Sequence, residues 1–253
     1  MKIKAIAVNT FKEAVRNKIF YLLIFFGIFF SFSSRIISLL TIGDTSKIIK
    51  DIGLASINFF SVLIAVFSGI NLVYKEIEKK TVYNILSKPV HRRDFILGKF
   101  LGLAFTLSVA LTLMAAMFMF FLYVFTGNID LILLLYFLFL YFELLILISV
   151  SILFSSFSTP ILSSIFTISI YFIGHFVWTF NEFKYKITGT FEKAFAYFFY
   201  YIFPNLEKFN IKNSVVMGEA VKTDVFVSTI LYGSFFVSAI LTLSIYIFNR
   251  REF

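Results

Sequence analysis

The chain has 253 residues, of which 60% are hydrophobic and only 15% are charged. A soluble domain has roughly half its residues apolar and about a quarter charged, so this composition excludes a soluble globular protein and favours an all-α polytopic membrane protein. The net charge of +9 is divided among segments between hydrophobic runs, which argues against nucleic-acid binding. The lack of cysteine excludes disulfides and thiolate metal sites.

Residues 1–18 predict an amphipathic helix that lies in the cytoplasmic interface of the membrane. Its apolar residues recur at helical spacing, while its basic residues lie elsewhere on the helix. The predicted apolar face holds Ile3, Ala7, Val8, Phe11, Ala14 and Val15.

Residues 19–253 predict a transmembrane domain of six helices. A helix needs about 20 apolar residues to cross the hydrocarbon core, and long stretches without Asp, Glu, Lys or Arg meet this need. The stretch 144–181 is too long for one span and is divided at Pro160, which follows a polar run. The predicted spans cover about 19–40, 53–74, 100–125, 131–153, 161–180 and 225–248.

Lysine and arginine predict the orientation of these spans. With six spans both chain ends lie on one side, and that side, which also holds the loop 75–99, carries most of the Lys and Arg residues. Such residues concentrate on the cytoplasmic side. We therefore expect a multi-pass protein of the cell membrane with both termini cytoplasmic; a prokaryotic origin is a separate expectation.

The loop 75–99 is the main candidate for a functional contact. A charged segment follows the second span and continues to Leu86 with helical potential, and Pro89 then ends it. Carboxylates contribute little to topology, so Glu76 and Glu78 suggest a contact with another protein, although plain surface charge is the alternative. We interpret Lys79, Lys80, Lys88 and Lys99 as topology anchors.

This loop resembles that of ABC-2 type permeases, the membrane subunits of many ABC exporters. In that family, acidic residues after the second span precede a Thr, a Leu, a Pro, basic residues and a Lys at the third span. The matching residues are Glu76, Glu78, Thr81, Leu86, Pro89, Arg92, Arg93 and Lys99. The six-span layout is also similar, and the segment 203–210 resembles one in permeases of nitrous-oxide-reductase maturation systems.

The resemblance implies a permease coupled to a separate cytoplasmic ATPase dimer, which would bind ATP and Mg²⁺, and to a second permease copy, identical or related. It also implies that the 75–88 segment, with Arg92 and Arg93, transmits ATPase movement. This chain has no cofactor site or ATPase motif of its own, because Gly98 and Lys99 are followed by Phe100 rather than Ser or Thr. The expected direction of transport is export.

Residues 181–224 predict an outer loop. Its aromatic segment 191–203 is too short to span, which indicates a re-entrant or interfacial helix, or an aromatic belt at the headgroups. The remainder is expected to form an exposed cap that holds Lys208, Asn210, Lys212 and Asn213.

Polar residues inside the spans are the candidates for a substrate path. Glu143 lies well inside the fourth span, where an ionisable residue indicates function, and Arg35 or His175 could pair with it. Small and hydroxyl residues on a span more often make packing contacts than bind ligands. The candidates are Asn58, Ser61, Ser68, Glu143, Thr167, Tyr171 and His175, the last three in a stripe with Ser164, Gly174 and Trp178; no metal site is expected.

Two other functions remain open from the residues alone. An autonomous carrier or channel would move its substrate without ATP. A membrane-embedded enzyme acting on lipids would use Glu143 and His175 as reacting groups. The substrate itself is not predicted by any feature of the sequence.

Overall fold

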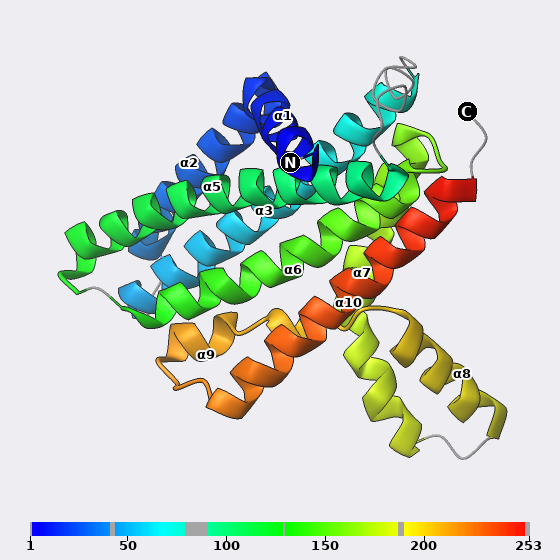
Figure 1. Ribbon diagram of the computed structural model, residues 1–253. Coiled ribbons are helices and arrows are strands. Elements are labelled where there is room, and N and C mark those ends of the chain that lie inside the picture. Colours follow the sequence, from blue (N-terminus) through cyan, green and yellow to red (C-terminus); the bar gives the residue numbers. More distant parts are fainter. Residues whose placement is uncertain (1, 41–43, 79–90, 129, 187–189, 251–253) are drawn as a thin grey trace.

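The computed structural model describes residues 2–40, 44–78, 91–128, 130–186 and 190–250 as a bundle of helices without strands (Figure 1). Six of the described helices are long and apolar enough to cross a membrane, which confirms the all-α polytopic class. The elements are α1 Lys2–Arg16, α2 Lys18–Leu40, α3 Thr45–Glu78, α5 Arg92–Thr126, α6 Ile132–Ser155, α7 Pro160–Lys186, α8 Thr190–Ile202, the 3-10 helix η1 Leu206–Phe209, α9 Lys212–Met217 and α10 Thr223–Arg250.

Several helices continue beyond the charge-free stretches of the sequence. The helix α3 begins at Thr45 rather than near 53, and α5 begins at Arg92 rather than near 100. Charges mark the limit of the hydrocarbon, whereas a helix continues as long as its backbone groups remain paired. Ion pairs hold the extended start of α3: Lys50 pairs with Asp130, and Lys212 lies 2.9 Å from Asp51.

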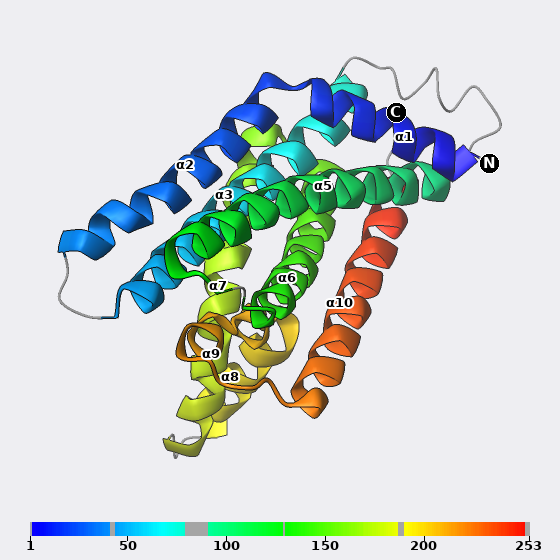
Figure 2. The same cartoon turned by 90° about the vertical axis from the view of Figure 1, so that its left-hand side faces the viewer.

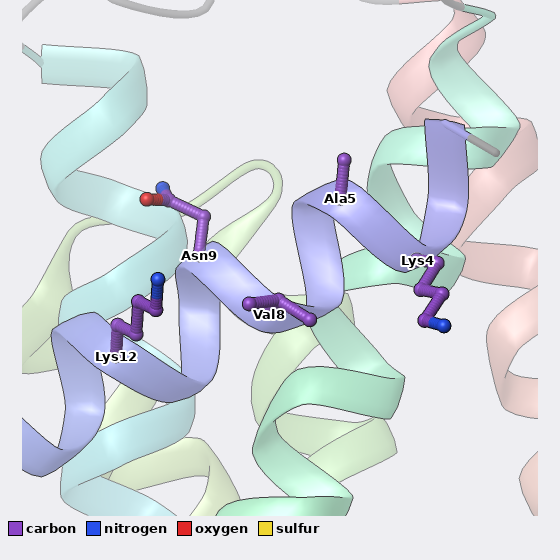
Figure 3. Close-up of a pocket in the computed structure, with 5 residues that line it drawn as sticks. All are labelled: Lys4, Ala5, Val8, Asn9 and Lys12. Atoms are coloured by element: carbon purple, nitrogen blue, oxygen red, sulfur yellow. The ribbon is translucent and has the colours of Figure 1, made fainter.

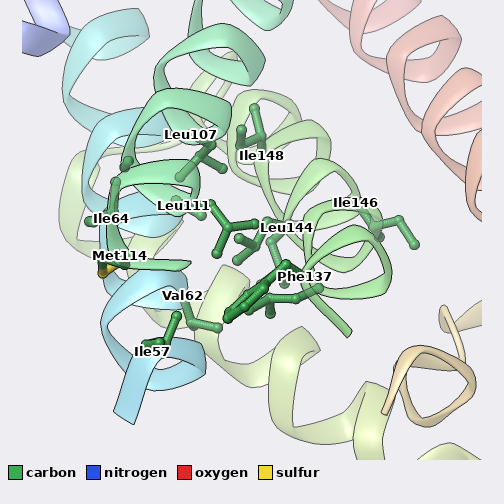
Figure 4. Close-up of a cluster of buried hydrophobic side chains, with 14 of the residues drawn as sticks. Ile57, Val62, Ile64, Leu107, Leu111, Met114, Phe137, Leu144, Ile146 and Ile148 are labelled. Carbon is green, nitrogen blue, oxygen red and sulfur yellow. The ribbon is translucent and has the colours of Figure 1, made fainter. Parts of the chain in front are cut away.

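The helix α6 forms the centre of the bundle and contacts α3, α5, α7 and α10. Its span is the most buried of the six, at 61%, against 22% for those of α7 and α10. Aliphatic and aromatic side chains fill the space between α6, α3 and α5 (Figure 4). The labelled members of this core are Ile57, Val62, Ile64, Leu107, Leu111, Met114, Phe137, Leu144 and Ile148, while the buried Ile146 points to the other side of α6.

The N-terminal helix α1 packs across the first turns of α5 (Figure 2). A side-chain carbon on Gly98 would lie 2.7 Å from Ile6, and one on Gly102 would lie 2.6 Å from the Ala7 carbonyl oxygen. These glycines, four residues apart, therefore let two backbones approach closely. The buried side of α1 differs from the predicted apolar face, since Val8 is 45% exposed and Thr10 is buried.

The predicted outer loop is largely helical and partly buried. The helix α8 packs beside α7 and exposes Phe191, Phe198 and Tyr201. Leu206, Phe209 and Val215, in contrast, are at most 1% exposed. Of the predicted cap residues, Lys208, Asn210 and Asn213 are exposed as expected, whereas the apolar residues between them are buried because η1 and α9 fold back onto the bundle. Whether α8 is re-entrant or interfacial stays a prediction.

Candidate functional site

Glu143 lies at the centre of the bundle, near the middle of α6, and is 1% exposed. Its Oε1 atom lies 3.1 Å from Nε2 of His175 on α7. Of the two partners that the sequence suggested, the structure therefore brings His175 to Glu143. Arg35 instead places its guanidinium 5.3 Å from the ring centre of Phe125.

His175 also contacts a second carboxylate. Its Nδ1 atom lies 2.9 Å from Oε2 of Glu207 in η1, so the imidazole bridges two glutamates. A neutral imidazole has one donor and one acceptor nitrogen, whereas an imidazolium donates at both. Either the ring is protonated, or one of the two carboxyl groups carries a proton. The imidazole and the two carboxyl groups, which come from α6, α7 and η1, therefore carry at least one proton more than a neutral ring with two carboxylates would.

Two glycines allow η1 to pack closely against α7 and α10. A side-chain carbon on Gly174 of α7 would lie 2.7 Å from Leu206, and one on Gly233 of α10 would lie 3.0 Å from Phe209. The bulky side chains of η1 thus fill the surfaces that the glycines leave open. Glu207 lies between them in sequence and is turned towards His175.

Hydrogen bonds fix both ends of the inserted segment. The backbone N–H of Asn205 donates to the Tyr232 hydroxyl at 2.7 Å, and Lys208 lies 4.3 Å from the centre of the same tyrosine ring. The side-chain amide of Asn210 donates to Glu207 at 2.9 Å. These contacts hold the Glu207 carboxylate in the orientation in which it contacts His175.

The polar cluster extends to α3 through Tyr171. The Tyr171 hydroxyl donates to Oδ1 of Asn58 at 3.1 Å, and its ring lies 4.8 Å from that of His175. Asn58, Tyr171, His175, Glu143 and Glu207 therefore form one connected set, which we call the polar cluster. It joins α3, α6, α7 and η1.

The other path candidates lie outside this set. Thr167 is buried and donates to the Ser163 carbonyl within α7, while Ser61 is buried and its hydroxyl has no partner among the described residues. Ser68 is half-buried, about three turns along α3 from Asn58. Among the described residues, no group of three or more His, Cys, Asp or Glu is arranged to hold a metal ion.

Of the residues predicted to couple to an ATPase, those that the structure describes lie at the end of α3 and at the start of α5. Glu76 and Glu78 belong to the last turn of α3, while Thr81, Leu86 and Pro89 lie outside the described residues. The Arg92 guanidinium donates to the carbonyls of Phe248 and Asn249, at 3.0 and 2.9 Å, and so caps α10. Arg93 is exposed, with its Nε atom 3.6 Å from Asp94.

Lys99, which the sequence suggested as a topology anchor, lies inside the bundle. It is 1% exposed and its Nζ atom lies 3.8 Å from Glu13, between α5 and α1. The sequence also gave no role to Glu207. The only available signal was its place in the segment 203–210, where Leu206 and Phe209 are large apolar residues that a solvent-exposed loop would not need.

Comparison with known proteins gives one clear similarity. The family model described as ABC-2 family transporter protein matches residues 4–253, almost the whole chain. No curated protein matches the chain.

Proposed function

Because the chain belongs to the ABC-2 family of transporter proteins, whose members are membrane subunits rather than catalytic ones, we propose that it is the permease of an ATP-driven exporter. A separate cytoplasmic ABC ATPase dimer binds ATP and Mg²⁺ and supplies the energy. The permease lies in the cell membrane with both termini in the cytoplasm. No observation identifies a more specific subgroup.

The observation that carries this proposal is the continuity of α3. The helix runs without a break from Glu78, beyond the charge-free stretch that ends at Tyr74, to Asn58 in the polar cluster. That distance is 20 residues, or about 30 Å of helix. A force applied near Glu76 and Glu78 would therefore reach the polar cluster through one rigid element.

The same end of the bundle is mechanically linked to three further helices. Arg92 joins the start of α5 to the end of α10, and Lys99 joins α5 to Glu13 of α1. Movement of the segment between α3 and α5 would thus move α1 and α10 together with α5. This is the arrangement that a permease driven from the cytoplasm requires.

The substrate route in this proposal runs beside α3 and α7 and is completed by a second permease copy. Only 22% of the α7 span is buried within the chain, and Phe172 and Phe176 are exposed on it. Asn58, Tyr171 and His175 are the groups nearest to such a route. Ser61 and Ser68 on α3 and Thr167 on α7 lie on the same helices, closer to the cytoplasm.

Charge reversal at Glu76 and Glu78 tests the proposal. We expect the double variant Glu76→Lys/Glu78→Lys to insert normally, because carboxylates contribute little to topology. It should lower the ATPase activity that co-purifies with the tagged permease from its native cells by at least fivefold. The measurement is ATP hydrolysis per permease after purification in mild detergent.

The matched control is Glu192→Lys/Glu219→Lys, which reverses two exposed carboxylates at the other end of the bundle. This control should retain full ATPase activity. An equal loss in both variants, or no ATPase with the unaltered chain, would contradict the coupling role.

A further inference from the structure

One side of α1 faces away from the bundle and carries only positive charge. Lys4, Ala5, Val8, Asn9 and Lys12 line a shallow, open hollow on this side (Figure 3). Lys4 and Lys12 are two helical turns apart and both exposed, and Val8, between them, is 45% exposed. The hollow therefore combines two cations with an apolar floor.

The single carboxylate of α1 is turned away from this hollow. Glu13 is the only acidic residue in the helix, and its Oε2 atom lies 3.8 Å from the buried Nζ of Lys99. The lysines of the hollow thus have no neutralising partner on their own helix. An anionic group from outside is the natural complement to this face.

The position of α1 places the hollow near the membrane surface. Asn17 alone separates α1 from α2, and its Oδ1 atom accepts the Ile19 N–H at 3.0 Å, which fixes the start of α2. The first turns of α2 expose Ile19 and Leu22, at 47% and 52%. Such side chains face hydrocarbon in a spanning helix, so α1 lies at headgroup level.

We propose that this hollow binds the headgroup of an anionic phospholipid. Lys4 and Lys12 contact its phosphate oxygens, and the Asn9 amide donates to the headgroup. Ala5 and Val8 contact the glycerol and the upper acyl chain. An acidic protein surface would offer no such apolar group to these two residues, so the hollow fits a lipid better. Basic residues near an anionic leaflet each strengthen such binding by about fivefold.

The test uses the full chain in nanodiscs of phosphatidylcholine that contain a fraction of phosphatidylglycerol. The chain has no cysteine, so Leu22→Cys provides one dye site on the lipid-facing side of α2, outside the hollow. Quenching of the dye by spin-labelled phosphatidylglycerol is compared with quenching by spin-labelled phosphatidylcholine. We expect a preference for phosphatidylglycerol that falls about 25-fold in Lys4→Gln/Lys12→Gln, fivefold for each lysine.

Two matched variants keep the test decisive. Lys4→Arg/Lys12→Arg preserves both charges and should retain the preference. Lys47→Gln/Lys222→Gln removes two exposed lysines from the other end of the bundle and should also retain it. An unchanged preference in Lys4→Gln/Lys12→Gln overturns the proposal. So does the absence of any lipid preference in the parent chain, combined with a cysteine in Lys4→Cys that becomes protected only when an ATPase partner is added.

Discussion

At the scale of single residues, His175 is the group on which the polar cluster depends. It is the shared partner of Glu143 and Glu207, so its loss would leave Glu143 buried without a partner. A buried polar group without a partner costs about 1–3 kcal/mol, and more when it is charged. We therefore expect His175→Leu to lower the free energy of unfolding by at least this amount, measured through thermal unfolding followed by Trp178, the only tryptophan.

The double variant Glu143→Leu/His175→Leu provides the control. Replacing both members of a buried pair with apolar residues is often neutral or stabilising. We expect the double variant to be more stable than His175→Leu. The change in unfolding free energy of the double variant should therefore differ clearly from the sum of the changes in the two single variants. Equal stability of the two variants would mean that the contact between Glu143 and His175 does not contribute.

Part of this cluster was predictable from the sequence. Glu143 and His175 are ionisable residues inside apolar stretches, and such residues are candidates wherever they occur. Glu207 was not found, because it lies beside Lys208 in a segment that was expected to belong to an outer loop. Its contact with His175 depends on Gly174 and Gly233, which lie on other helices and let η1 pack closely, and no local pattern reports that contact.

At the scale of elements, the length of the hydrophobic stretches predicts where the spans lie, but it does not predict which helices pack against each other. The sequence predicted a helix over residues 1–18 and placed it on the membrane interface. In the structure the helix also packs onto α5 through Gly98 and Gly102. Glycines spaced four apart indicate close helix packing without saying which helix approaches. The pairing therefore required the three-dimensional arrangement.

Substitution of Gly102 tests this pairing. In Gly102→Val, the new side chain would collide with the Ala7 carbonyl oxygen, which belongs to the backbone and cannot rotate away. Overpacking of this kind costs about 1–3 kcal/mol. We expect α1 to move away from α5, which would broaden the distance distribution between spin labels at Lys12→Cys and Leu113→Cys.

The control for this experiment is Ala5→Val, which adds the same methyl groups on the exposed side of α1. Its distance distribution should match that of the parent chain. A narrow, unshifted distribution in Gly102→Val would show that the interface between α1 and α5 tolerates the larger residue.

At the scale of the whole molecule, charge is distributed unequally between the two ends of the bundle. The end with α1, the start of α5 and the end of α10 carries the basic residues of α1 together with Arg92, Arg93 and Arg250. The other end carries paired charges, such as Lys50 with Asp130 and Lys212 with Asp51. Basic residues that remain on the cytoplasmic side favour one orientation over its inverse.

Cysteine labelling in intact cells measures this orientation, because the chain has no cysteine to remove. We expect a cysteine at the exposed position 219, between α9 and α10, to react with a membrane-impermeant maleimide in intact cells. A cysteine at the exposed position 93 should react only after permeabilisation. The reverse pattern would place Glu76 and Glu78 outside the cell, where no ATPase has access to ATP, and would remove the basis of the coupling proposal. Reaction at both positions in intact cells would instead indicate leaky cells, which a cytoplasmic marker protein detects in the same sample.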